Sequence, residues 1–375
     1  MKSPGIYLDY AAATPVDRRV FAAMKPYFFD IFGNPSSVHR IGVLAREAVE
    51  VARKSVAGLV GARSEGVTFT ASTTEAAAVL FHSIAKQFPG KRHAVALSIE
   101  HKAIIESLRL AGYEVTLVKV DRYGVARAED VLSAIRPDTG IVSVQLVNNE
   151  TGVVQPVTVI GKAIAMLSTD KPVFHSDVSQ AMVTQVIDLS GMHLDAVTFS
   201  AAKMYGPKGV AALVVRHGVP LAPFFSGGGQ ERGVRAGTEN VPGIVGFGEA
   251  ARLCVLERSM RVKHLLAARE VFLERLSGSG CVDWASQAER SPHIASIRTP
   301  KDAEMLMVRL ENVGVFVSAA SACTRGESKS HVLQAIGIPD GDLLRTIRVS
   351  FGTPTTLLQA RRAGKLVAQA AIDQL

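Results

Sequence analysis

Short apolar runs alternate with amphipathic segments between about residues 60 and 215. Runs of this length, bounded by polar or turn residues, are typical of strands that a sheet buries on both faces. The predicted strands are Val67–Thr70, His93–Leu97, Glu114–Val118, Ile141–Val147, Val173–Ser176, Ala196–Ser200 and Val210–Val215. The predicted helices between them are Thr74–Gln87, Ala103–Leu110, Ala128–Ile135 and Val157–Leu167. This alternation predicts an α/β fold whose large domain is a mostly parallel sheet flanked by helices.

A second, smaller alternation follows a glycine-rich loop at Gly227–Gly229. Its predicted helices are Gly246–Leu276, Asp302–Leu310, Lys329–Ile336 and a terminal helix from Thr356. Its predicted strands are His293–Arg298, Val315–Ser318 and Thr346–Ser350. We expect a large domain over residues 15–245, and a small α+β domain built from residues 1–14 and 246–375.

Composition narrows the class of protein. Of the 375 residues, 47% are hydrophobic and 20% are charged, as in ordinary soluble proteins. No uncharged apolar stretch of the length needed for a membrane span is present, and the first residues do not resemble a signal peptide. The three cysteines, Cys254, Cys281 and Cys323, are widely spaced, which argues against a disulfide framework and for the reducing cytoplasm. No Cys/His zinc spacing appears, so we predict no metal site.

The net charge of +8 changes this picture little. Basic residues are scattered along the chain rather than gathered with aromatic residues. Direct nucleic-acid binding is therefore not predicted as the main function.

Polar residues follow five of the predicted strands. Ligands of doubly wound sheets bind beyond the carboxyl ends of the strands, so these residues are candidates for one shared site. Each of them alone has an ordinary explanation, such as a helix cap or a solvated loop. The residues are Thr73 and Thr74; His101; Asn149; Asp177 and Gln180; and Ser200 and Lys203.

Together these side chains match what pyridoxal 5′-phosphate (PLP) requires. Its phosphate needs hydroxyls and a helix start, and its pyridine nitrogen needs a carboxylate such as Asp177. Its ring hydroxyl needs amide groups, which Asn149 and Gln180 offer, and its aldehyde needs the amine of Lys203. Thr73, Thr74 and Ser200 supply the hydroxyls.

Eight motifs, in order along nearly the whole chain, resemble those of the cysteine desulfurases, in the class V aminotransferase branch of the fold-type I PLP enzymes. The motifs are YLDYAAATPV (7–16), FGNPSSVHRIG (32–42), EHKAI (100–104), VNNETGVVQP (147–156), HSDVSQ (175–180), KMYGPKG (203–209), GGGQERGVRAGTEN (227–240) and SACTRGESKSHVLQAIG (321–337). The cysteine motif resembles the family's branch with a long cysteine loop.

The resemblance implies a role for each candidate residue. Lys203 would carry PLP and move protons, and Cys323 would accept sulfur. His101 would stack on the ring and act as acid or base, while Arg348 would clamp the substrate carboxylate with help from Asn34. The remaining implied cofactor ligands are Asp177, Gln180, Asn149, Thr73, Thr74 and Ser200, and Thr238 would reach the phosphate in the other subunit of a homodimer.

The implied reaction converts L-cysteine to L-alanine and leaves a persulfide on Cys323. The acceptor of that sulfur would be an iron–sulfur scaffold or a tRNA-thiolation enzyme. Two alternatives stay open: selenocysteine lyase or another class V activity, and a partner-binding scaffold with a degenerate PLP site.

The chain departs from the family pattern next to the lysine. Where the family usually has Ser-Gly-His, this sequence has Ser200-Ala201-Ala202. The phosphate loop, Ala71 to Ala76, also lacks a glycine and one hydroxyl of the usual pattern. Both changes bear on how tightly PLP binds.

Overall fold

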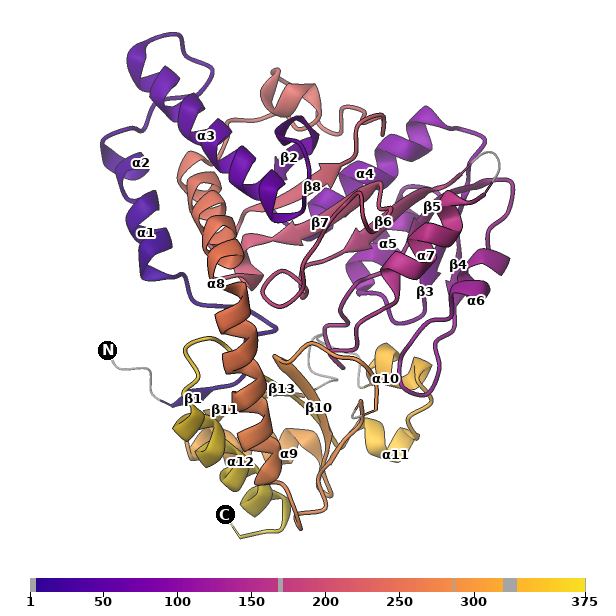
Figure 1. Ribbon diagram of the computed structural model, residues 1–375, viewed down its shortest axis with the longest axis vertical. Helices are drawn as coiled ribbons and strands as arrows, with labels where there is room; N and C mark the ends of the chain where they lie inside the picture. The colour runs from indigo at the N-terminus through magenta and orange to yellow at the C-terminus, as the bar shows by residue number, and fades with distance from the viewer. Residues whose placement is uncertain (1–4, 168–170, 286, 320–328, 375) are drawn as a thin grey trace.

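A seven-stranded sheet forms the upper lobe of the computed structural model, which describes residues 5–167, 171–285, 287–319 and 329–374 (Figure 1). The strand order is β2-β8-β7-β6-β5-β3-β4. All neighbouring strands are parallel except at β8, which is antiparallel to both β2 and β7. The strands are β2 (Val67–Thr70), β3 (His93–Leu97), β4 (Glu114–Val118), β5 (Thr139–Ser143), β6 (Val173–Asp177), β7 (Ala196–Ser200) and β8 (Ala211–Val215). The predicted mostly parallel sheet is confirmed.

Strand β5 starts two residues earlier than predicted and ends at Ser143 rather than Val147. Beyond Ser143 the backbone still bonds to β6, because Val144 N donates to His175 O. On the other side, however, Gln145 N donates to the carboxylate of Glu100 at 2.6 Å. A side chain thus replaces strand β3 as the partner, which the apolar pattern of the segment could not reveal.

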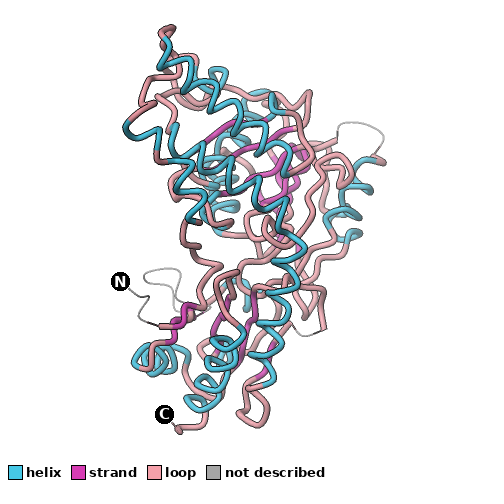
Figure 2. Tube along the Cα trace, turned by 60° about the vertical axis from the view of Figure 1, so that its left-hand side comes forward, coloured by secondary structure: helices cyan, strands magenta, loops and turns pink. Residues whose placement is uncertain are grey.

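Alternate residues of the sheet feed two separate cores. In β3, Ala94 and Ala96 belong to the core under α4 (Thr73–Gln87) and α5 (Lys102–Leu110). Val95 and Leu97 face the opposite core. That second core is covered by α3 (Arg40–Leu59), α6 (Ala128–Ser133), α7 (Val157–Ala165) and the first part of α8 (Val241–Glu274). Figure 2 shows the helices enclosing the strands in a second view.

Helix α8 connects the two lobes. It packs against α3 in the upper lobe and against α12 (Leu357–Ala371) in the lower lobe (Figure 1). Gly248 allows the close approach to α3, since a Cβ there would lie 2.5 Å from Ala52 Cα. Asn240 caps the helix through Gly243 N, so α8 begins earlier than predicted. The predicted domain limit at 245/246 falls inside this helix and stays a prediction.

The lower lobe holds a smaller sheet of order β12-β13-β10-β9, antiparallel throughout. Strand β1, near the N-terminus, pairs with β11 in this lobe rather than with the large sheet. The predicted strand Val315–Ser318 divides into two short strands here. The elements of this region are β1 (Ile6–Tyr7), β9 (Val282–Asp283), β10 (Ile294–Arg298), α9 (Ala303–Asn312), β11 (Val315–Phe316), β12 (Ser318–Ala319), α10 (His331–Ala335), α11 (Asp340–Leu343), β13 (Thr346–Ser350) and α12. Two short helices, α1 (Arg18–Met24) and α2 (Pro26–Phe29), connect β1 to α3.

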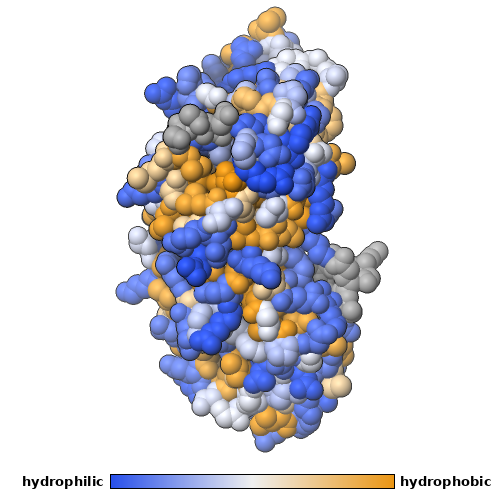
Figure 3. Space-filling model, turned by 90° about the vertical axis from the view of Figure 1, so that its right-hand side faces the viewer, coloured by the Kyte–Doolittle hydropathy of each residue, from blue (hydrophilic) through white to orange (hydrophobic). Residues whose placement is uncertain are grey.

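The face over β4, α6 and α7 mixes polar and apolar side chains (Figure 3). Leu117 of the edge strand β4 and Val159 of α7 are exposed there. No helix among the described residues is long and apolar enough to cross a membrane.

Candidate functional site

Lys203 lies where β7 passes into a short 3-10 turn, Ala201–Lys203. Its Nζ donates to Ala11 O at 2.8 Å and to Ala12 O at 2.6 Å. The turn that follows β1 therefore reaches the large sheet and helps to hold the lysine at the carboxyl end of β7. Sequence reasoning identified the lysine but not these two carbonyl partners.

The neighbouring strand ends bring His101 and Asp177 to the same place. Loss of hydration lowers the pKa of the His101 imidazole; the Asp177 carboxylate opposes this shift and the Lys203 ammonium adds to it. His101 Nδ1 accepts from Ala103 N at 3.1 Å, so His101 also caps α5. Asp177 keeps one oxygen on Ser179 N at 2.9 Å. A neutral imidazole, a carboxylate and an amine thus converge at this edge.

The two predicted amide ligands have different surroundings. Asn149 Oδ1 is buried and has no hydrogen-bond partner among the residues that the structure describes. Gln180, in contrast, donates to Ala11 O at 2.9 Å and accepts from His293 Nε2 at 3.2 Å. Burial lowers the pKa of His293 to about 3, with the charge of Arg348 adding to the shift, so this ring is neutral. His293 was not predicted, because it contacts the site only through the fold of the lower lobe.

Arg348 reaches the site from β13 of the lower lobe and is 3% exposed. Its guanidinium donates to Asp9 Oδ1 at 2.8 Å and to Asn149 O at 3.1 Å. Its buried Nε has no hydrogen-bond partner in the described part of the chain. The turn at Asn149 therefore both carries the buried Oδ1 and orients Arg348 through its backbone carbonyl. Asp9 was missed, although it lies within the first of the eight motifs.

The predicted phosphate residues surround the start of α4. Ser72 caps the helix through Glu75 N at 3.1 Å, and Thr73 Oγ1 lies 3.4 Å from Ser179 Oγ. Thr74 is exposed. The partial positive charge of a helix N-terminus favours a phosphate at this position.

Ser200, at the end of β7, completes the predicted phosphate set. Its Oγ accepts from Ala202 N at 3.2 Å, so this hydroxyl already caps the turn that carries Lys203. The departure at Ala201 is accommodated by Gly206, where a Cβ would lie 2.7 Å from the Ala201 Cβ.

The remaining three predicted residues have different positions. Asn34 lies in the loop before α3, and its Oδ1 accepts from Ser36 N. Thr238 is exposed and lines a cavity of about 210 Å³ together with Thr70 and Ala71, at the carboxyl end of β2. Cys323 lies outside the described residues.

Of the other two cysteines, Cys254 is buried and Cys281 is partly buried. Cys254 is fully buried in α8 and accepts a hydrogen bond from Arg261 Nη1 at 3.2 Å. Burial raises the pKa of both the Cys254 and the Cys281 thiols. Neither is set up as a thiolate nucleophile.

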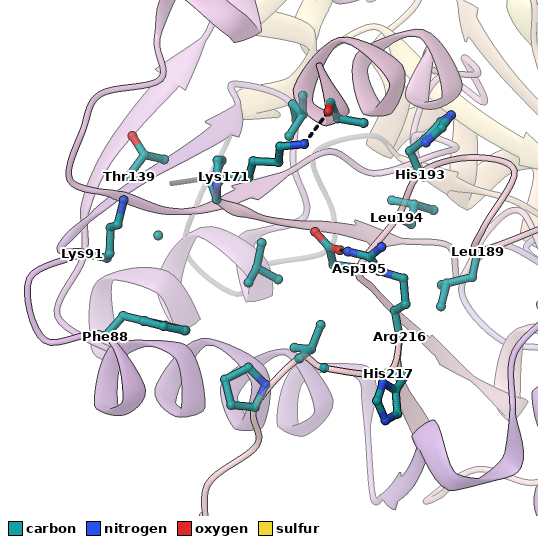
Figure 4. A pocket seen from close by; sticks show the side chains of 18 of the residues that line it. Phe88, Lys91, Thr139, Lys171, Leu189, His193, Leu194, Asp195, Arg216 and His217 are labelled. Carbon is teal, nitrogen blue, oxygen red and sulfur yellow. Dashed lines mark hydrogen bonds and ion pairs between the residues drawn. The ribbon is translucent and has the colours of Figure 1, made fainter. Parts of the chain in front are cut away.

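A larger cavity, of about 530 Å³, lies at the opposite edge of the sheet (Figure 4). Thr139, Pro172 and Asp195, which line it, stand at or before the amino ends of β5, β6 and β7. Its charged side chains have partners: Asp195 pairs with Arg216 at 2.5 Å, and Lys171 donates to Ala165 O. The cavity is therefore separate from the edge that holds Lys203.

Unsatisfied and convergent groups at the carboxyl edge fit PLP. The buried Asn149 Oδ1 and Arg348 Nε lack partners within residues 5–167, 171–285, 287–319 and 329–374. The amine, carboxylate and helix start suit an aldehyde, a pyridine nitrogen and a phosphate. Gln180 and Ser200 would have to share their present hydrogen bonds with the cofactor.

The chain matches the family model described as aminotransferase class V over residues 6–360. A cysteine desulfurase IscS from a species of Anaeromyxobacter is 40% identical over 385 aligned positions, covering 98% of this chain and 93% of that protein. Among solved structures, a NifS-like protein matches with a TM-score of 0.92 at 32% identity, covering 99% of this chain and all of that one. A structure described as SspA in complex with cysteine matches with a TM-score of 0.80 at 32% identity, covering 93% and 99%.

Proposed function

The chain belongs to the cysteine desulfurases of the class V aminotransferase family, and from this premise we propose that it removes sulfur from L-cysteine by means of PLP held at Lys203. Enzymes of this family are PLP-dependent, so PLP is the cofactor of this protein. The observation that carries the proposal is the convergence of Lys203, His101 and Asp177 at one edge of the sheet. The alternatives of selenocysteine lyase and of an inactive scaffold gain no support from the comparisons.

When bound, PLP supplies an electron sink that lets bonds at the substrate carbons break. Lys203 Nζ would hold the cofactor and then move a proton at the substrate Cα. Asp177 would keep the pyridine nitrogen protonated through its carboxylate. Asn149, whose Oδ1 has no partner among the described residues, would bind the ring hydroxyl together with Gln180.

Arg348 would orient L-cysteine through its carboxylate. The guanidinium is fixed by Asp9 and by Asn149 O, and no residue that the structure describes accepts a hydrogen bond from its Nε. A planar donor fork held in this way binds a carboxylate with defined geometry. The SspA structure that contains cysteine supports L-cysteine as the substrate.

The thiolate of Cys323 would attack the sulfur of the bound L-cysteine. The bond between that sulfur and Cβ breaks, its electron pair stays with the carbon skeleton, and protonation at Cβ gives L-alanine. Cys323 then carries the extra sulfur as a persulfide, so one thiol and one cysteine become one persulfide and one alanine. His101, with its lowered pKa, is neutral at pH 7 and available to accept a proton.

We also propose that the protein is a cytoplasmic homodimer that passes the sulfur to a partner protein. Large apolar side chains are exposed in and just after α2, where Phe28, Phe29 and Phe32 are 51%, 73% and 69% exposed. An apolar surface of this kind is typical of an interface between subunits. In such a dimer Thr238, on its exposed loop, would contribute to the partner's phosphate site. The acceptor would be an iron–sulfur scaffold or a tRNA-thiolation enzyme.

The test is a desulfurase assay with the purified protein, supplied with PLP and L-cysteine. Alanine and sulfide released with a reductant are measured for the wild type, for Cys323→Ala and for Lys203→Ala. We expect the cofactor's visible absorption to survive in Cys323→Ala while turnover is lost, and both to be lost in Lys203→Ala. Full turnover by Cys323→Ala would remove the role of that cysteine, and no cofactor absorption in the wild type would refute the proposal.

A further inference from the structure

The first residues of α10 are tied across the lobe boundary to the carboxyl edge of the large sheet. Ser330 caps α10 by accepting from Leu333 N at 3.1 Å, and its hydroxyl donates to Glu150 Oε2 at 2.5 Å. The next residue, His331, donates from Nε2 to Glu100 O at 2.9 Å. Ser330 and Glu150 are only 5% and 8% exposed, so water competes little for this contact.

Glu150 belongs to the same turn as the proposed cofactor and substrate ligands. In the residue before it, Asn149, the side-chain Oδ1 has no partner among the described residues, and the backbone carbonyl accepts a hydrogen bond from Arg348. Asn148 fixes the turn by accepting from Glu150 N and Thr151 N, both at 2.9 Å. In this turn, Asn148 holds the backbone, Asn149 would bind the cofactor, and Glu150 holds the start of α10.

The segment with Cys323 joins this anchored point directly. Strand β12 ends at Ala319, paired to β13 in the lower lobe, and Cys323 stands seven residues before Ser330 in the sequence. One end of the segment is therefore fixed to the lower lobe, and the other is fixed to the upper lobe through Ser330 and His331.

We propose that Glu150 is a positioning residue for sulfur transfer, whose carboxylate holds Ser330 and so fixes the end of the Cys323 segment relative to the cofactor site. The inference rests on the function proposed above. It assigns to Glu150 no contact with PLP or L-cysteine. A bond from a hydroxyl to an ionised carboxylate is short and strong, which suits a 2.5 Å anchor.

The charge on Glu150 gives this anchor a measurable signature. Burial raises the pKa of Glu150 to about 7, against the hydrogen bond from Ser330 and the charges of Arg348 and Lys102. The carboxylate form, which accepts from Ser330, is therefore gained as the pH rises through about 7. The anchor and the transfer step that depends on it should strengthen over the same range.

A second contact near α10 offers a matched control. Lys329 Nζ pairs with Asp340 Oδ2 at 2.7 Å, but Asp340 is 73% exposed and belongs to α11 of the lower lobe. Breaking this pair removes a tie of the same segment without releasing it from the large sheet. Exposed pairs of this kind contribute little to stability.

The experiment measures single-turnover persulfide formation by the PLP-loaded enzyme with L-cysteine, using mass spectrometry of the Cys323 peptide. We expect Glu150→Gln and Ser330→Ala to slow persulfide formation about tenfold. A shift of a reacting group by about 1 Å can slow a reaction by this factor or more. Ser330→Thr, which keeps the hydroxyl, and Asp340→Asn should stay within about twofold of the wild type. The visible absorption of the bound cofactor and its change on adding L-cysteine should be unaltered in all four variants.

The pH profile separates positioning from general loss of structure. The ratio of the wild-type rate to the Glu150→Gln rate should rise as the pH increases through about 7, since only the wild type gains the carboxylate there. A ratio that is constant with pH would overturn the proposal, as would wild-type rates in both Glu150→Gln and Ser330→Ala. Thermal unfolding identifies a variant that fails to fold, and the Ser330→Ala and Ser330→Thr pair then decides.

Failure of the proposed function gives a different result. If Cys323→Ser supports sulfide release as fast as the wild type, the assignment of Cys323 is wrong and the positioning role of Glu150 is refuted with it. If Cys323→Ser is inactive while Glu150→Gln and Ser330→Ala transfer sulfur normally, the proposed function stands and the role of Glu150 is refuted.

Discussion

The two edges of the large sheet both carry polar side chains, but they differ in whether the polar atoms have hydrogen-bond partners. At the amino edge, around the 530 Å³ cavity, Asp195 accepts from both Phe174 N and Arg216. At the carboxyl edge, several buried polar atoms have no partner among the described residues. These atoms are Ser98 Oγ, Glu100 Oε2, Asn149 Oδ1, Ser176 Oγ and Arg348 Nε.

Within the large sheet, the described polar atoms without partners lie at the edge where the strand ends converge, and not at the edge with the 530 Å³ cavity. Buried polar groups are normally paired, because leaving one unpaired costs about 1–3 kcal/mol. A bound ligand can supply the missing hydrogen-bond partners of such groups. None of the described residues that line the amino-edge cavity has a buried side-chain polar atom without a partner.

The largest contrast is expected between two arginines. Arg348→Ala should lower kcat/KM for L-cysteine about a hundredfold, because it removes a buried charge partner of the substrate carboxylate and leaves Asp9 unpaired. Arg216→Ala, at the amino edge, removes a pair whose arginine is 61% exposed and should change stability by less than about 1 kcal/mol. Steady-state kinetics and thermal unfolding of both variants measure this, and equal losses of activity would erase the distinction between the edges.

The next effect is a pH dependence of stability from His293. Its pKa is lowered from 6.5 to about 3, so the folded state keeps the ring neutral while the unfolded chain takes up a proton below pH 6.5. The stability that depends on this group is lost as the pH falls below 6.5, by roughly 2 kcal/mol between pH 6.5 and 4.5.

Replacing His293 by Gln should flatten this acid limb in urea unfolding. Other buried histidines, such as His175, contribute equally to wild type and variant and cancel in the comparison. The exposed His217 of the amino edge supplies the control, and His217→Gln should leave the curve unchanged. A His293→Gln curve parallel to that of the wild type would contradict the neutral ring.

The smallest contrast lies within one turn. Asn149→Ala should weaken PLP binding about fivefold to tenfold, the worth of one hydrogen bond, with little change in the stability of the cofactor-free protein. Asn148→Ala should instead destabilise the cofactor-free protein by about 3 kcal/mol, since its buried side chain bonds to Ile99 O and to two backbone N–H groups. PLP titration and thermal unfolding distinguish the two, and a destabilised cofactor-free Asn149→Ala would mean that its amide is already satisfied.

The sequence predicted the large sheet well because its strands are buried on both faces and bounded by turns. Strands β2, β3, β4 and β7 have the predicted limits. Helix α3 was not among the predicted elements, although it packs along α8 as a main layer of the upper lobe. Strand β5 ended early because the Glu100 carboxylate, distant in sequence, took its backbone partner.

The site was predictable where its residues follow strands and was hidden where other elements reach in. Lys203, His101 and Asp177 come together as expected from parallel strands. Local patterns could not place the groups that approach from the segment after β1 or from the lower lobe. These groups are Asp9, the carbonyls of Ala11 and Ala12, and His293. The roles of Asn34, Thr238 and Cys323 stay predictions. Thr238 lines a cavity at the carboxyl end of β2, Asn34 lies in the loop before α3, and Cys323 lies outside the described residues.

The most direct measurement is to add PLP to the protein, reduce it with borohydride so that the cofactor stays on the amine that holds it, and locate the label by peptide mass spectrometry. The account predicts the label on Lys203, at the carboxyl edge of the sheet. A label on Lys91 or Lys171, which line the amino-edge cavity, or no label at all, would contradict the claim that the carboxyl edge is the active one.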